Sequence, residues 1–155
     1  RQGAVSPAAL QAAIQSPITT NIPTVSAPRV PGASAIHYAP EKPVLMADYD
    51  TIVAQLLALM AEPSPSQLAV SVLSFSEKPL ALSAWSRLDW QAVSRDPVVY
   101  QQQLYARLRA FDKSSAQQLW IEGVPMGADA WLAIHDRLVR ATARVKFGPK
   151  YSKYR

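Results

Sequence analysis

The chain has 155 residues, of which 49% are hydrophobic and 17% are charged, and its formal net charge is +5. This apolar fraction is too high for a disordered chain, and no apolar run approaches the roughly 18 residues that a membrane-spanning helix needs. The absence of cysteine excludes a disulfide scaffold, a zinc-thiolate site, an iron–sulfur cluster and a cysteine nucleophile, and with only His37 and His135 a metal site of several histidines is excluded as well. We therefore expect one soluble globular domain without a metal site.

The first part of the chain is rich in proline, with seven of the 13 prolines in residues 1–43. Ser6 and Pro7 are typical of a helix start, and the sequence up to Ile14 predicts one short helix. Residues 16–42 are predicted to form an extended linker, because each proline fixes its own backbone angle and pushes the preceding residue toward extended geometry. Since the chain opens on arginine and lacks the zones of a secretory signal, we expect it to be a piece of a longer protein.

After Pro43, short apolar runs alternate with helical patterns. We predict a strand at residues 43–47, followed by a helix that Asp48 caps. Its expected apolar face consists of Ile52, Leu56, Leu57 and Met60. The two prolines in residues 62–66 break the chain, and residues 67–75 are predicted to form a buried strand, with a weaker strand candidate at 80–84.

Asp96 and Pro97 repeat the pattern of a cap followed by proline. They predict a helix to about residue 111, with Tyr100, Leu104, Leu108 and Phe111 on one side. A strand at residues 118–122 and a helix over about 128–145 follow, the helix with an apolar face of Trp131, Ile134, Leu138 and Ala141. This alternation predicts a small three-layer α/β domain, with a mainly parallel sheet of about four or five strands and right-handed crossovers.

The sequence contains no dinucleotide fingerprint, Walker loop or hydrolase elbow. Two pairs of carboxylates could serve as general acid and base. For Asp48 and Asp50 helix capping is the better interpretation, and for Asp129 and Asp136 a surface ion pair that involves Arg140. We expect His135 to have a packing or surface role. The four tryptophans, Trp85, Trp90, Trp120 and Trp131, are expected in the core rather than on a base-stacking surface.

The end of the chain is basic: from Arg140 to Arg155 there are six basic residues and no acidic one. Arg144, Lys146, Lys150 and Lys153 are therefore candidates for RNA binding, with a salt-dependent affinity that would disappear when the chain is cut near Val145. The alternative is a solvated terminus that binds nothing.

The linker carries a second candidate site in RVPGASAIHYAP, residues 29–40. Gly32 allows close backbone approach, His37 can donate a hydrogen bond to phosphate or carboxylate oxygens, and Tyr38 can stack or form hydrogen bonds. Polar and aromatic residues on a proline-stiffened loop are typical of a lid over a ligand held elsewhere. The alternative is an ordinary linker that packs on its own domain.

Four segments resemble the two-domain L-threonylcarbamoyladenylate synthases, in which a YrdC-like catalytic domain precedes a small Rossmann-like domain. PGASAIHYAP resembles the linker motif of that family, approximately SPGMKYRHYAP. RQGAVSPAALQAAI is similar to the end of the catalytic domain, LYARLRAFD to the LYxxLRxLD helix, and AIHDRLVRATA to the closing AIxDRLxRAA helix. The resemblance implies a remnant of the catalytic domain at 1–15, the linker at 16–42, the α/β domain at 43–145 and a basic tail at 146–155.

The resemblance also implies the activity of the parent protein, a nucleotidyltransferase. The family converts threonine, bicarbonate and ATP, with magnesium, to threonylcarbamoyl-adenylate and pyrophosphate, for threonylcarbamoyladenosine modification of tRNA in the cytoplasm. The ATP site belongs to the catalytic domain, so we expect this piece alone to be inactive and to hold no cofactor. Further expected partners are that catalytic domain of the same chain, and tRNA or the proteins that transfer the threonylcarbamoyl group.

By this resemblance the linker acts as a lid over the active site, and Pro31, Gly32, His37 and Tyr38 are the residues that match the motif. The chain departs from the motif at Val30 and at residues 33–36, where a lysine and a tyrosine of the motif are missing. Either Arg29 compensates for them, or the lid closes mainly through His37 and Tyr38. The competing functions are a tRNA-binding module that uses the basic tail, and a purely structural or dimerisation domain.

Overall fold

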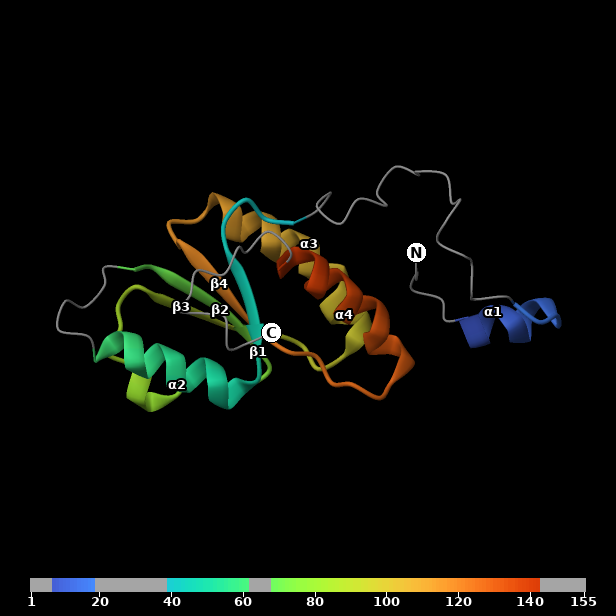
Figure 1. Cartoon of the computed structure of the whole chain (residues 1–155), viewed down its shortest axis with the longest axis horizontal. Helices are drawn as coiled ribbons and strands as arrows, with labels where there is room; N and C mark the ends of the chain where they lie inside the picture. The colour runs from blue at the N-terminus through green and yellow to red at the C-terminus, as the bar shows by residue number, and fades with distance from the viewer. Residues whose placement is uncertain (1–6, 19–38, 62–67, 143–155) are drawn as a thin grey trace.

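The computed structural model describes residues 7–18, 39–61 and 68–142 of the chain. Within them, four α-helices, four strands and one short 3-10 helix follow one another (Figure 1). In chain order these are α1 (Pro7–Ile14), β1 (Val44–Ala47), α2 (Tyr49–Met60), β2 (Val70–Ser74), η1 (Leu80–Leu82), β3 (Leu88–Ala92), α3 (Pro97–Lys113), β4 (Gln118–Glu122) and α4 (Asp129–Thr142).

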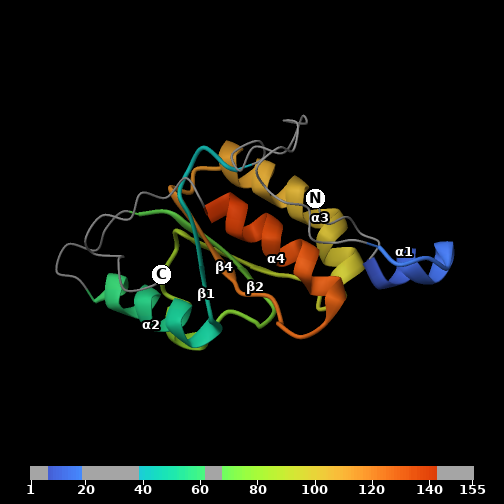
Figure 2. The ribbon, with the colours of Figure 1, turned by 45° about the vertical axis from the view of Figure 1, so that its right-hand side comes forward.

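The four strands form one sheet in the order β1-β4-β2-β3, and every neighbouring pair is parallel. The chain moves from β1 to β2 and β3 with α2 and η1 on one face, and it returns to β4 with α3 on the other. Both crossovers therefore have the same hand, as the twist of a parallel sheet requires. Since α3 and α4 lie side by side on their face of the sheet (Figure 1 and Figure 2), the protein is a small three-layer, Rossmann-like α/β domain.

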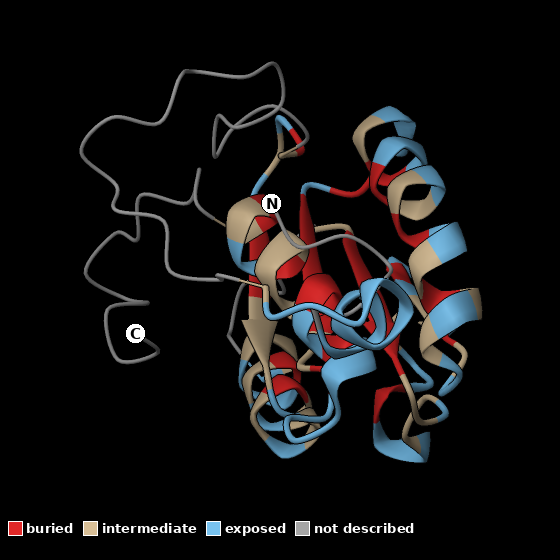
Figure 3. Cartoon of the chain, turned by 90° about the vertical axis from the view of Figure 1, so that its right-hand side faces the viewer, coloured by how far each residue is buried: buried red, intermediate tan, exposed pale blue. Residues whose placement is uncertain are grey.

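The core consists of two clusters, one on each face of the sheet, because successive side chains of a strand point to opposite faces. On β4, Leu119 and Ile121 pack with the buried residues of α3 and α4, whereas Trp120 packs with Ile52 and Leu56 of α2. Figure 3 shows that the buried residues follow the strands and the inward sides of the helices. The faces predicted for α3 and α4 are confirmed, since every residue predicted on them is buried.

The caps predicted for α2 and α3 are present. Asp48 Oδ1 accepts a hydrogen bond from Thr51 N at 2.8 Å, and Asp96 Oδ1 accepts one from Val98 N at 2.8 Å. These bonds satisfy backbone N–H groups that have no partner within the helix. Asp48 therefore caps α2, as its position in the sequence predicts.

Two details of the prediction are wrong. Residues 80–84 do not form a strand, because Leu80–Leu82 is a 3-10 turn, and the missing strand is β3 at Leu88–Ala92. This strand lies at the sheet edge, so only Leu88 and Trp90 pack inward and its other residues are polar or small. Leu57 is exposed because it lies about 140° around the helix axis from Ile52, outside the buried stripe.

Candidate functional site

The residues predicted to act on a ligand lie outside the described residues. These are Arg29, Pro31, Gly32, His37 and Tyr38 of the linker and Arg144, Lys146, Lys150 and Lys153 of the tail. The described structure resumes at Ala39 and Pro40, which are the last two residues of the linker motif. Pro40 is buried, so the point at which the linker motif ends is packed against the domain.

The two residues that follow the motif are bound to the end of α3 by one carboxylate. Asp112 Oδ1 accepts hydrogen bonds from the backbone N–H of Glu41 at 3.0 Å and from that of Lys42 at 3.4 Å. The residues joined are 71 and 70 positions apart in the sequence. A carboxylate with two backbone donors fixes the direction in which the chain enters β1.

The Lys42 side chain binds the same helix end. Its Nζ donates to Ser114 O at 2.6 Å and to Phe111 O at 3.4 Å, and it lies 5.5 Å from the centroid of the Phe111 ring. The last carbonyls of a helix lack partners within the helix and carry partial negative charge, so an ammonium group is favourable there. Together, Asp112 and Lys42 form what we call the linker anchor.

The linker anchor brings two of the family-like motifs together. Asp112 is the last residue of LYARLRAFD, and Glu41 follows the HYAP of the linker directly. No role is predicted from the sequence for Asp112 or Lys42. A signal was nevertheless present, because an aspartate in the last turn of a helix faces the negative end of the dipole and needs donors from elsewhere.

A second carboxylate ties two strands at their carboxyl ends. Glu122 Oε2 accepts hydrogen bonds from Ser74 Oγ at 2.6 Å and from Phe75 N at 2.8 Å. In open α/β sheets this edge is where ligands bind. Here, three rings meet beside it, with centroids 5.6–5.7 Å apart in each pair of Phe75, Tyr100 and Trp131. Side chains therefore pack at the position of the usual ligand crevice.

Within this ring cluster, Tyr100 is buried and its hydroxyl has no hydrogen-bond partner among the described residues. Burial raises the pKa of Tyr100 well above its ordinary value, because the phenolate would be deprived of water. The hydroxyl therefore stays neutral over the physiological range.

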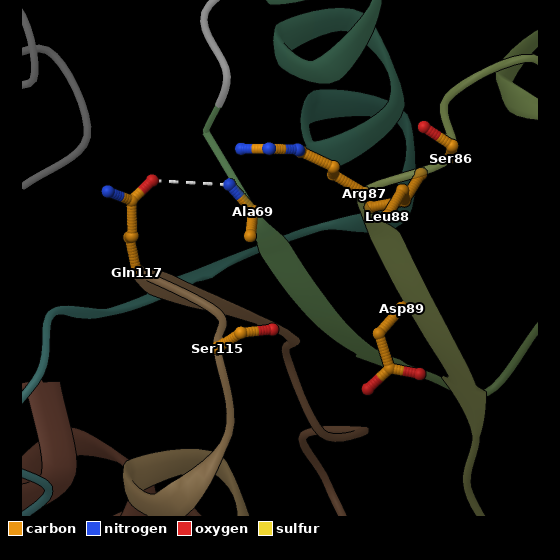
Figure 4. A pocket seen from close by; sticks show the side chains of 7 residues that line it. All are labelled: Ala69, Ser86, Arg87, Leu88, Asp89, Ser115 and Gln117. Carbon is orange, nitrogen blue, oxygen red and sulfur yellow. Dashed lines mark hydrogen bonds between the residues drawn. The ribbon is translucent and has the colours of Figure 1, made fainter.

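The opposite, amino edge of the sheet carries an open pocket of about 640 Å³ (Figure 4). Gln117 closes one side, where its Oε1 accepts a hydrogen bond from Ala69 N at 3.2 Å. Asp89 lies on the other side, and its Oδ2 accepts from Ser71 Oγ at 3.2 Å and from Gln91 Nε2 at 2.6 Å. The pocket offers donors and acceptors to a polar molecule. Its lining residues are Ala69, Ser86, Arg87, Leu88, Asp89, Ser115 and Gln117.

The ion pair and the tryptophans considered from the sequence take part in surface pairing and in packing. Arg140 Nε donates to Asp136 Oδ2 at 2.9 Å, which confirms the surface ion pair predicted on the last helix. Trp120 and Trp131 are buried, and Trp85 and Trp90 are half-buried against the core.

In the part of the chain that the structure describes, no three His, Cys, Asp or Glu side chains are grouped to hold a metal ion. None of the helices described there has the length and apolar character needed to cross a membrane.

Comparison with protein families gives one match that covers most of the chain. The family model described as threonylcarbamoyl-AMP synthase, C-terminal domain, matches residues 5–143. Searches of curated proteins and of solved structures found no match. The matched range includes the linker motif, the motif that ends in Asp112 and the whole of α4.

Proposed function

This chain belongs to the threonylcarbamoyl-AMP synthase C-terminal domain family, and from that premise we propose that it anchors a linker which acts as a lid over the synthase active site. In this family a companion catalytic domain lies in the same chain. On our proposal that domain binds threonine, bicarbonate and ATP with magnesium, and it forms threonylcarbamoyl-AMP and pyrophosphate. The present domain supplies no reacting group and holds one end of the lid.

The observation that carries the proposal is the linker anchor. Glu41 and Lys42 follow the linker motif directly, and both are bound to the end of α3 through Asp112. A segment held at both ends has fewer conformations than a free one, so anchoring lowers the entropic cost of placing it over a cavity. The domain would therefore increase the fraction of time for which the lid is closed.

On this proposal, lid closure protects the reaction from water. The threonylcarbamate intermediate and the mixed anhydride of the product are both hydrolysed by water, and a closed active site excludes it. His37 and Tyr38 are the linker residues proposed to contact or cover the nucleotide. Loss of closure would then waste ATP, because intermediate or product would be hydrolysed before transfer.

The test is an Asp112→Ala substitution in the intact synthase, with Asp129→Asn as the control, since Asp129 is an exposed carboxylate at the start of α4. We expect threonylcarbamoyl-AMP formed per ATP consumed to fall severalfold for Asp112→Ala and to stay unchanged for Asp129→Asn. An unchanged ratio in a correctly folded Asp112→Ala enzyme would contradict the proposal.

A further inference from the structure

A groove between α3 and α4 is separate from the linker anchor and from both edges of the sheet. It has a volume of about 350 Å³ and is formed by the first half of α3 and by two residues of α4. Its walls are mostly apolar, and Val98 on its rim is 62% exposed. The lining residues are Pro97, Val98, Gln101, Gln102, Tyr105, Ala130 and Arg137.

Arg137 is the cation of this groove, and one of its donors has no partner among the described residues. Its Nε is buried without a hydrogen-bond partner, and the side chain forms no ion pair with another described residue. The guanidinium carbon lies 5.8 Å from the centroid of the Tyr105 ring, which fixes its position by a cation–π contact. A buried donor that stays unsatisfied costs free energy, and because Nε is buried, an acceptor in the groove would meet the terminal nitrogens of the guanidinium instead.

The neighbouring acid on α4 is already engaged. Asp136 accepts two hydrogen bonds from Arg140, at 2.9 Å from Nε and at 3.1 Å from a terminal nitrogen. This fork-like pair uses both carboxylate oxygens of Asp136. An acceptor for Arg137 would therefore have to lie outside the described residues or belong to a partner.

We propose that the groove binds an acidic segment of the synthase's own catalytic domain, with an aspartate or glutamate carboxylate on Arg137 and an apolar neighbour against Val98. A guanidinium and a carboxylate pair through two parallel hydrogen bonds, and the amides of Gln101 and Gln102 can satisfy polar groups nearby. The inference rests on the proposed function only in that it takes the catalytic domain as the neighbour.

Two other occupants fit the groove less well. A nucleic acid backbone is bound by several cations that neutralise successive phosphates, whereas Arg137 alone is charged among the lining residues. A second copy in a two-fold symmetric dimer would have to present an acidic side chain of its own to each groove, because such an interface repeats every contact. A tethered domain also has a high effective concentration, so a small groove is sufficient to hold it.

The test is photo-crosslinking in the intact synthase, with benzoylphenylalanine in place of Val98. We expect a crosslink within one polypeptide, to a catalytic-domain peptide that contains Asp or Glu. Arg137→Gln should lower its yield about tenfold, while Arg137→Lys, which keeps the charge but loses the two parallel hydrogen bonds, should lower it less. Arg140→Lys, which keeps a cation beside Asp136, should leave the yield unchanged. The same photoreactive residue in place of Leu80, which is 88% exposed on the other face of the sheet, is the control position.

Four results would overturn the inference: a product of twice the mass, a crosslink to RNA, a yield that Arg137→Gln does not change, or no crosslink at Val98. The measurement does not depend on activity. If the crosslink fails while Asp112→Ala has its severalfold effect, the groove is rejected as a binding site for the catalytic domain. The proposed role of the linker anchor then still stands.

Discussion

Asp112 Oδ1 accepts a hydrogen bond from the backbone N–H of Glu41 at 3.0 Å and so joins the end of α3 to the start of the domain, 71 positions earlier. The aspartate lies in the last turn of its helix, where the helix dipole disfavours negative charge. Donors from Glu41 and Lys42 offset that cost. This relationship makes Glu41 and Lys42, at the end of the proposed linker, a part of the α/β domain.

Lys42→Met should destabilise the domain by about 1 kcal/mol. The variant keeps the apolar contact with Phe111 but removes the ammonium that donates to Ser114 O and Phe111 O. The midpoint of urea unfolding, measured on the intact synthase by the fluorescence of the domain's tryptophans, checks this. Lys78→Met is the matched control, and an equal loss in both variants would show that Lys42 acts only through its charge.

Glu122→Gln should cost about 1–3 kcal/mol. The amide has the same shape as the carboxylate but accepts more weakly from Ser74 Oγ and Phe75 N, which it joins across β4 and β2. Denaturant unfolding of Glu122→Gln beside Asp129→Asn measures the difference. Equal unfolding midpoints for the two variants would mean that Glu122 does not hold this edge of the sheet.

Tyr100→Phe should stabilise the protein or leave its stability unchanged, because it removes a buried hydroxyl without a partner. We expect a gain of about 0.5–1 kcal/mol at pH 7 in the free energy of unfolding. A loss above about 1 kcal/mol would show that the hydroxyl has a partner.

The same variant has a signature at alkaline pH. Burial raises the pKa of Tyr100 in the folded state, so above about pH 10 the unfolded state binds fewer protons than the folded state. Stability from this group is therefore present below pH 10 and is lost as the pH rises further. The slope of stability against pH between 10 and 11 should be shallower in Tyr100→Phe than in the wild type.

Local signals predicted most of the fold. Asp48 and Asp96 were recognised as caps because aspartate before a helical pattern satisfies free N–H groups, and β4 was found at its observed bounds because its apolar run is buried on both faces. The strand β3 was missed because Asp89 and Gln91 face away from α2, and an edge strand of this kind has no continuous apolar run.

The candidate site was harder to predict than the fold. Asp112 and Glu41 meet only through tertiary structure, and periodicity carries no information about a contact across 71 positions. The same holds for Arg137 and Tyr105, which lie on different helices. The lid residues His37 and Tyr38 were proposed from their chemistry and a family resemblance, and they remain predictions.

A double-mutant cycle of Asp112→Ala and His37→Ala in the intact synthase tests the central claim most directly, with threonylcarbamoyl-AMP formed per ATP consumed as the readout. If Asp112 acts by holding the linker that carries His37, each single variant lowers the ratio and the double variant is no worse than the poorer single one. Effects that multiply in the double variant, or an Asp112→Ala enzyme with the wild-type ratio, would contradict it.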